Sequence, residues 1–370
     1  MTQGGFTVPA SRSISTTLDI ARGVSALAVF SVHLIACFLF RYIGDENPVA
    51  IGLGFIAQYA VLVFFLLSGY LITTAIVSNI KRFGGLDMID YLSSRIARLY
   101  PPLIASIAIT VAAYWIVQAF CLPGSCSAYG VPGDLWRPRE YFELSSSDVA
   151  QALAMRGGLI NPNGALWSLY VEFSLYIVAM GIAGTITWRK HAWLIGLLIA
   201  ALGVVYGLKV NEHFAFFALV WCIGAAFVFF KQRRLAWATI LATLVGLFVF
   251  TFWGPGIASV ERFDAPAVVF RLCACSVIAL GLFNFPAWST RLSSAIGTTA
   301  LFSYTLYIIH APLLMLVLSL SQNWIGYSHL RSVAVAMVAF FVILTISILL
   351  ARIVEQPRFF KQIILSAFLR

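Results

Sequence analysis

Residues 18–34 read LDIARGVSALAVFSVHL, an apolar stretch that carries two ionisable side chains deep within it, Arg22 and His33. Most of its other residues suit a helix that crosses a membrane. Ionisable side chains at such a depth cost free energy, and they usually mark a binding or catalytic site. We therefore expect this segment to take part in the chemistry of the protein as well as in its packing.

The whole chain is more apolar than a soluble protein. Of its 370 residues, 61% are hydrophobic and 10% are charged, and the mean hydropathy is +0.94. A soluble domain is about half apolar and about a quarter charged. The composition predicts an all-α fold, a polytopic integral membrane bundle that forms a single domain over residues 1–370.

The number of spanning helices follows from the length that a bilayer requires. One span needs about 20 mainly apolar residues. This length predicts about ten transmembrane helices, at residues 18–40, 51–79, 100–120, 165–187, 192–208, 214–230, 235–253, 267–284, 300–320 and 332–353. An even number of spans places both termini on one side of the membrane.

The distribution of charge predicts which side that is. The net charge is +10, but the positive residues lie in short loops between apolar segments, which argues against nucleic acid as a partner. Counted from a cytoplasmic N-terminus, the inner loops hold most of the Lys and Arg, and the outer loops hold most of the acidic residues. Lys and Arg concentrate on the cytoplasmic side, so we expect both termini to be cytoplasmic.

Two connections are long. Residues 80–99 are basic and inner, and they read as an amphipathic piece at the membrane surface. Residues 121–164 are outer, rich in Pro, Gly, Ser and aromatic residues, and long enough to shape a binding surface. Cys121 and Cys126 lie in this outer loop, and the sequence leaves open whether they form a disulfide.

His33 and Glu172 are the residues that we predict to be catalytic. At a rise of about 1.5 Å per residue, both fall in the outer half of the membrane. A carboxylate in hydrocarbon needs a partner, and a histidine oriented by a carboxylate can remove a proton from a hydroxyl. The alternative that the sequence leaves open is a structural polar pair between two helices. We expect neither a metal nor a permanently bound cofactor.

Other polar residues are predicted to line the same site. Tyr304, Tyr307 and His310 are spaced i, i+3 and i+6, so they can share one face of a helix. A lone histidine such as His310 is more often a packing or hydrogen-bonding group than a catalyst. The full set of predicted lining residues is Trp167, Ser168, Tyr304, Tyr307, His310 and Glu355.

A group of arginines is predicted to bind the phosphates of a donor. Arg95 and Arg98 lie on one side of a helix where the inner loop re-enters the membrane. Guanidinium groups match phosphate oxygens well, and Arg22, Arg358 and Lys361 lie on the same predicted side. The alternative is that these residues only anchor the inner face of the bundle.

These residues, in this order, resemble the acyltransferase family 3 of membrane proteins, over nearly the whole chain. The likeness rests on Arg22 with His33, FFLLSGYLI at 64–72, Arg95 with Arg98, WSL at 167–169 with Glu172, SY at 303–304 with Tyr307 and His310, and Glu355 with Pro357. We expect no fused SGNH-type hydrolase domain of the kind that some members carry.

The resemblance implies O-acylation, usually O-acetylation, of an extracytoplasmic or lipid-linked carbohydrate, with cytoplasmic acetyl-CoA as the donor co-substrate. It also implies the bacterial inner membrane as the location, acyl-CoA binding or transfer for Arg22, Arg95 and Arg98, and an essential role for His33. The expected partners are therefore acetyl-CoA, a carbohydrate acceptor and the lipid bilayer. The acceptor hydroxyl, the acyl length and the oligomeric state stay open.

Two further alternatives stay open at this point. The acyl group can pass directly to the acceptor, or through a covalent intermediate on Ser168, the only hydroxyl nucleophile near the matched motifs. The rival class of protein is a transporter or flippase of a carbohydrate or lipid-linked sugar, because polar residues at mid-depth also line permeation paths.

Overall fold

The computed structural model describes residues 12–44, 47–126, 142–229, 232–254, 262–284 and 296–368, and its regular elements are helices. In chain order these are α1 (Arg12–Ile43), α2 (Pro48–Phe83), α3 (Met88–Ala119), α4 (Ser146–Leu153), α5 (Leu166–Thr187), α6 (Ala192–Val210), α7 (Phe214–Phe229), α8 (Gln232–Trp253), α9 (Ala265–Asn284), the 3₁₀ turn η2 (Thr298–Leu301), α11 (Ser303–Ile325), α12 (His329–Val354) and α13 (Pro357–Phe368). The predicted all-α fold is confirmed.

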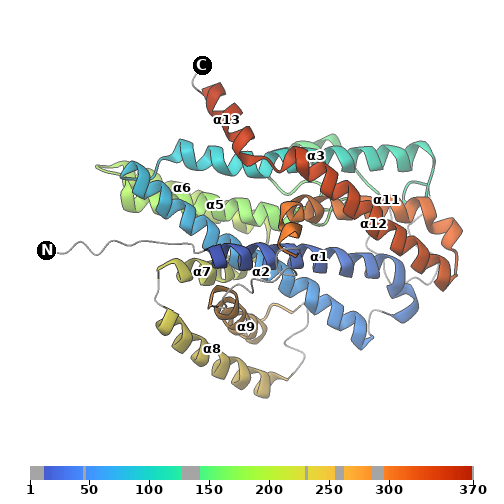
Figure 1. The fold of residues 1–370 in the computed structure, drawn as a ribbon, viewed down its shortest axis with the longest axis horizontal. Coiled ribbons are helices and arrows are strands. Elements are labelled where there is room, and N and C mark those ends of the chain that lie inside the picture. The colour runs from blue at the N-terminus through green and yellow to red at the C-terminus, as the bar shows by residue number, and fades with distance from the viewer. Residues whose placement is uncertain are drawn as a thin grey trace.

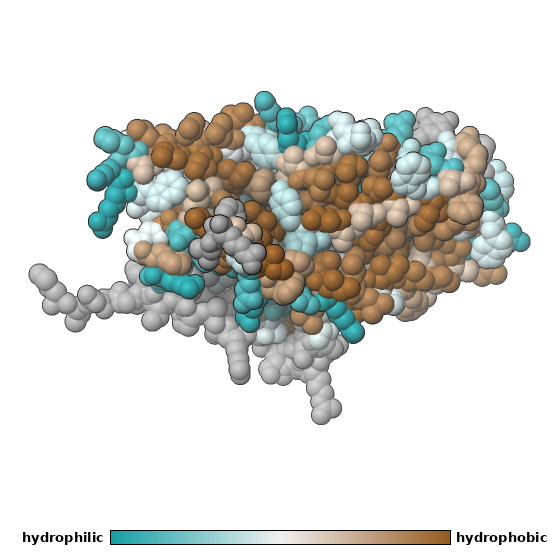
Figure 2. Space-filling model, turned by 90° about the horizontal axis from the view of Figure 1, so that it is seen from above, coloured by the Kyte–Doolittle hydropathy of each residue, from teal (hydrophilic) through white to brown (hydrophobic). Residues whose placement is uncertain are grey.

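Within the described residues, eight helices are long and apolar enough to cross a membrane, judged by length and composition. Two of the ten predicted spans, 214–230 and 235–253, correspond to shorter apolar helices, Phe214–Phe229 and Trp237–Trp253. Much of the face seen in Figure 2 is hydrophobic, and hydrophilic residues gather mainly toward its ends and edges. These features indicate an integral membrane protein. The count of ten and the side of the termini stay predictions.

Local sequence signals explain where α2 begins and ends. The side chain of Asn47 accepts a hydrogen bond from the Val49 amide, and Pro48 occupies the first turn, where its missing N–H costs nothing. At the other end Gly84 adopts a left-handed conformation with φ of 75°, which is costly for a residue with a Cβ. The chain then turns directly into α3.

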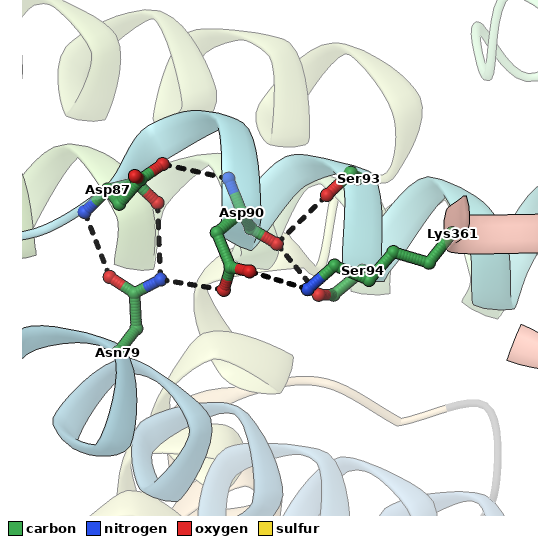
Figure 3. Close-up of polar contacts among 6 residues, drawn as sticks. All are labelled: Asn79, Asp87, Asp90, Ser93, Ser94 and Lys361. Carbon is green, nitrogen blue, oxygen red and sulfur yellow. Dashed lines mark hydrogen bonds and ion pairs between the residues drawn. The ribbon is translucent and has the colours of Figure 1, made fainter. Parts of the chain in front are cut away.

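The turn between α2 and α3 shows that one prediction was wrong. Residues 80–99 do not form a separate piece at the membrane surface, because they are the end of α2, a short turn and the beginning of α3. In Figure 3, Asn79 joins the two helices by donating to Asp90 and by bonding the backbone of Asp87. Lys361 of α13 lies 2.6 Å from the Asp90 carboxylate, so α13 is fixed against α3.

The centre of the bundle is built by α1, α2, α5 and α11, while α8 and α9 lie together along one edge (Figure 1). Helices α2 and α7 cross at two glycines. A Cβ at Gly69 would lie 2.0 Å from the Trp221 carbonyl, and one at Gly224 would lie 2.0 Å from the Leu66 carbonyl. This close approach brings aromatic side chains of α2 and α7 together beside the start of α5.

The predicted outer connection, 121–164, is only partly described. Cys121 and Cys126 form a disulfide at its start. It then contains α4, whose first turn is closed by reciprocal hydrogen bonds between Ser145 and Asp148. Residues 127–141 lie outside the described part of the chain. The end of the connection leads into α5, which begins within one residue of the predicted span.

Candidate active site

Three of the four predicted arginines, Arg22, Arg95 and Arg98, meet in one cavity, which we call the arginine cavity. Its volume is about 80 Å³, and it lies among α1, α2, α3, α5 and α11. Its polar and aromatic lining consists of Arg22, Phe64, Phe65, Ser68, Arg95, Arg98, Ser168, Glu172, Tyr176, Tyr304 and Tyr307. The sequence therefore predicted most of the polar residues that the fold brings to this cavity.

The guanidinium groups of this cavity are held by aromatic rings and a carboxylate. Arg95 lies 5.8 Å from the ring centre of Tyr91 and 5.9 Å from that of Tyr176. Arg22 lies 3.8 Å from the carboxylate of Asp19, one helical turn away, and its side chain is 17% exposed. Three positive charges thus line a small volume together with the one carboxylate of Glu172, and this positive balance favours an anionic ligand.

Glu172 belongs to the arginine cavity. Its Oε1 atom accepts hydrogen bonds from the Ser68 hydroxyl at 2.8 Å and from the Tyr176 hydroxyl at 2.6 Å. The predicted pairing of His33 with Glu172 is therefore wrong. Tyr176 is one turn along the same helix and Ser68 is on the adjacent α2, so nearby hydroxyls supply the partners that a carboxylate in the bundle requires.

His33 is paired with His310 instead. Its Nδ1 atom lies 2.9 Å from Nε2 of His310, and Nδ1 of His310 lies 3.1 Å from the carbonyl oxygen of Leu306. His310 is fully buried, between the rings of Phe30 and Tyr307, whose centres lie 6.1 and 6.0 Å from its own. The sequence placed both histidines in the site but did not predict that they bind each other.

A proline near His310 explains two residues that the sequence reasoning missed. Pro312 lies inside α11 and has no N–H, so the carbonyl of Ile308 loses its partner within the helix. That carbonyl accepts hydrogen bonds from the Ser106 hydroxyl at 2.7 Å and from the Asn163 amide at 2.8 Å. Pro312 could have indicated from the sequence that the Ile308 carbonyl needs a partner outside α11. The bond from Ser106 fixes α11 to α3.

The exposed side of His33 faces a second cavity, which we call the histidine cavity. Its volume is about 450 Å³. Its aromatic and polar lining consists of His33, Phe40, Gln58, Trp167, Asn211, His213, Phe216, Phe217, Phe263 and Tyr307. This lining contains no Lys, Arg, Asp or Glu side chain within the described residues, so it favours a neutral ligand with flat or hydroxyl-bearing faces.

Tyr307 separates the two cavities and lines both of them. Its hydroxyl lies 2.8 Å from the Ser168 hydroxyl, and its ring packs edge-on against Phe64, with 5.2 Å between the ring centres. Beside it, Trp167 packs against Phe217 at 5.0 Å. The predicted shared face of α11 is confirmed in this arrangement, because Tyr304 lies at the arginine cavity, Tyr307 at the boundary and His310 beside His33.

The remaining predicted residues lie toward the ends of α12 and α13. Glu355 accepts hydrogen bonds from the amide and the hydroxyl of Thr305 at 2.8 and 2.6 Å, so it caps the first turn of α11. Arg358 is exposed on α13 and does not line the arginine cavity. Lys361 pairs with Asp90. Within the described ranges there is no group of three His, Cys, Asp or Glu residues that could hold a metal ion.

The chain matches the model of one protein family. Residues 16–352 match the model of an acyltransferase domain, Acyl_transf_3. An O-acetyl transferase of Shigella phage Sf6 is 26% identical over 283 residues, which cover 72% of this chain and 77% of that protein. No solved structure matches. Since the matched region includes both cavities and nearly the whole bundle, the chain belongs to the acyltransferase family 3 that its sequence motifs resemble.

Proposed function

We propose that this acyltransferase is a membrane O-acetyltransferase that moves an acetyl group from acetyl-CoA to a hydroxyl group of a carbohydrate. The observation that carries the proposal is the pair of cavities on either side of Tyr307. One has a cationic lining suited to a phosphate-bearing donor, and the other has a neutral, aromatic lining suited to a sugar. The named activity of the phage relative supports the choice of acetyl transfer.

The donor enters at the arginine cavity. Guanidinium groups bind phosphate oxygens through charge-assisted hydrogen bonds, which are stronger in a site that excludes water. The cavity of about 80 Å³ is smaller than pockets for drug-sized ligands, which have about 300 Å³ or more. Its walls therefore have to move apart when the acyl-pantetheine arm enters, and Tyr307 is the part of the wall between the arm and His33.

The acceptor enters at the histidine cavity. The rings of Trp167, Phe216 and Phe217 offer apolar faces to a sugar ring, and Gln58 and Asn211 offer hydrogen bonds to its hydroxyl groups. The acceptor can be a polysaccharide, an oligosaccharide or a lipid-linked sugar. Its reacting hydroxyl lies against the exposed edge of His33.

The chemistry then needs one proton acceptor. His33 takes the hydroxyl proton as the acceptor oxygen attacks the carbonyl carbon of the thioester. The new C–O bond forms, the C–S bond breaks, and the proton on His33 passes to the departing CoA sulfur. The products are an O-acetylated sugar and free CoA, and all atoms of the reactants are accounted for.

The two substrates arrive from opposite sides of the bacterial inner membrane in this proposal. Arg95 and Arg98 lie near the start of α3, next to the α2–α3 turn with its flanking Lys81 and Arg82. Asn211 and His213, at the α6–α7 turn, belong to the histidine cavity. The positive charge beside the α2–α3 turn supports a cytoplasmic donor side and an extracytoplasmic acceptor side.

A direct assay tests the proposal. The purified protein is incubated with labelled acetyl-CoA and a panel of neutral and acidic oligosaccharides, and the label on each glycan is measured. We expect transfer by the wild type and a loss of about 10²- to 10⁴-fold in His33→Ala, the range that general base catalysis contributes. Transport of a sugar without any acyl transfer would favour the rival class, a carbohydrate transporter or flippase.

A further inference from the structure

We propose that His310 is a positioning residue that holds His33 in one tautomer, with its hydrogen on Nδ1 and its lone pair on Nε2. In this tautomer, Nε2 of His33 is the atom that accepts the proton of the acceptor hydroxyl. The inference rests on the proposed function for its catalytic meaning, but the tautomer itself follows from two contacts and from the burial of His310.

The first contact fixes the hydrogen of His310. Its Nδ1 atom lies 3.1 Å from the carbonyl oxygen of Leu306, one turn earlier on α11. A carbonyl oxygen can only accept a hydrogen bond, so Nδ1 of His310 carries the hydrogen and donates it.

The burial of His310 determines its charge. The side chain is 0% exposed, and none of the ion pairs among the described residues involves it. A buried, unpaired charge is expensive, so this imidazole is neutral. A neutral imidazole with its hydrogen on Nδ1 has a lone pair on Nε2. Nε2 of His310 is therefore an acceptor.

The second contact transfers this assignment to His33. Nδ1 of His33 lies 2.9 Å from the accepting Nε2 of His310, so Nδ1 of His33 must be the donor. In neutral His33 the lone pair is then on Nε2. His33 is exposed to the histidine cavity, and no described residue forms a hydrogen bond with its Nε2 atom. That lone pair is available to a bound hydroxyl.

His310 itself is held rigidly. The Ile308 carbonyl, two residues before it, is bound by Ser106 and Asn163, and Pro312 follows two residues after it. Two hydrogen bonds in a row thus link His33 to His310 and His310 to the Leu306 carbonyl. They fix the tautomer and the orientation of His33, which is what a carboxylate commonly does for a catalytic histidine. They do so without placing a negative charge in the bundle.

Two variants of similar size test this role. In His310→Gln, the amide oxygen can replace Nε2 as the acceptor for His33. In His310→Asn, the amide nitrogen can still donate to the Leu306 carbonyl, but the shorter side chain does not reach His33. We expect His310→Gln to keep kcat within about tenfold of the wild type, and His310→Asn to lose about 10²- to 10⁴-fold.

The Michaelis constant for acetyl-CoA separates positioning from a general loss of structure. It is expected to stay at the wild-type value in both variants, because His310 does not line the arginine cavity. His191→Gln, an exposed histidine outside both cavities, is the matched control. Equal loss in both His310 variants, or equal retention, would overturn the proposal.

The nitrogen-15 NMR spectrum of His33 in the wild-type protein tests the tautomer independently of activity. We expect a protonated Nδ1 and an unprotonated Nε2, with the His33 resonances assigned through His33→Gln. A protonated Nε2 would overturn the inference even if the protein transfers acetyl groups. Conversely, absence of transfer in the wild type would refute the proposed function and leave the tautomer result standing.

Discussion

The hydroxyl of Tyr307 lies 2.8 Å from the hydroxyl of Ser168, at the boundary between a cationic cavity and a neutral, aromatic one. Tyr307 is 8% exposed and Ser168 is 9% exposed, so the boundary is closed in this structure. A donor on one side and an acceptor on the other can meet only if this boundary opens. Tyr307 is therefore expected to control access of the thioester to His33.

Removing the Tyr307 ring should allow water to cleave the thioester without transfer of the acetyl group to the acceptor. In Tyr307→Ala the two cavities join, so water as well as acceptor can reach the thioester, and we expect faster release of free CoA when no acceptor is present. Tyr307→Phe keeps the ring against Phe64 and loses only the bond to Ser168, so it should stay close to the wild type. Measurement of CoA release with and without glycan checks both variants. An unchanged rate of hydrolysis in Tyr307→Ala would show that the ring is not the barrier.

Removing one arginine of the arginine cavity should weaken donor binding. A hydrogen bond to a charged group contributes about 1.5–3 kcal/mol, so Arg95→Ala or Arg98→Ala should raise the Kd for CoA by about 10- to 100-fold. Calorimetry on the purified protein measures this. Arg189→Ala, an exposed arginine between α5 and α6, is the control and should bind CoA normally. Normal binding by both cavity variants would place the donor elsewhere.

The two substitutions of Glu172 should behave differently. The amide oxygen in Glu172→Gln can still accept from Ser68 and Tyr176, so the fold should be kept, and loss of a negative charge among the arginines should leave CoA binding equal or tighter. Glu172→Ala leaves two hydroxyls without their acceptor, which costs about 1–3 kcal/mol for each such group. Thermal unfolding and CoA titration check these outcomes. A loss of kcat in Glu172→Gln as large as in His33→Ala would instead support the role predicted from the sequence, in which Glu172 orients His33.

Ser168 decides between direct transfer and a covalent intermediate. Ser168 is 9% exposed and its hydroxyl is hydrogen-bonded to Tyr307, and among the described residues no histidine or carboxylate bonds to it. A serine needs such a base to act as a nucleophile, so Ser168→Ala should keep most of the transfer activity. Intact-protein mass spectrometry after mixing with acetyl-CoA should find no added acetyl group. An acetylated wild type, together with an inactive Ser168→Ala, would establish the covalent route.

The disulfide provides a test of topology. Cys121 and Cys126 are bonded at the start of the connection that leads to the histidine cavity. Disulfides persist in oxidising compartments, so we expect this pair to resist thiol-specific labelling in intact cells until a reductant is added. Cys222, which is exposed and free, provides the comparison in the denatured protein. Immediate labelling of Cys121 and Cys126 would place this loop on the reducing, cytoplasmic side.

The sequence predicted the fold class because hydrophobic length is a strong signal. The span at 165–187 agrees with α5 to within one residue. The span at 100–120 was predicted to begin just before Pro101 and Pro102, which is too late. In the structure both prolines lie inside α3, which begins at Met88. This difference matters for the site, because the part of α3 before the predicted span holds Arg95 and Arg98, which line the arginine cavity.

It was harder to predict which site residues bond to each other than to predict which residues lie in the site. Helical spacing correctly placed Tyr304, Tyr307 and His310 on one face, because that relation is local. The choice of His310 over Glu172 as the partner of His33 depends on how α1, α5 and α11 are rotated against one another. Depth in the membrane does not determine that rotation, so two groups at similar depth were paired wrongly.

In the proposed mechanism, donor and acceptor approach from opposite faces of the membrane and react at His33. The most direct test uses proteoliposomes with labelled acetyl-CoA sealed on one side and a membrane-impermeant oligosaccharide acceptor on the other. We predict that the wild type places covalent acetyl label on the oligosaccharide, and that His33→Ala loses this activity by about 10²- to 10⁴-fold while still binding CoA. Transfer by His33→Ala at the wild-type rate, or passage of the oligosaccharide across the membrane without acetylation, would contradict the account.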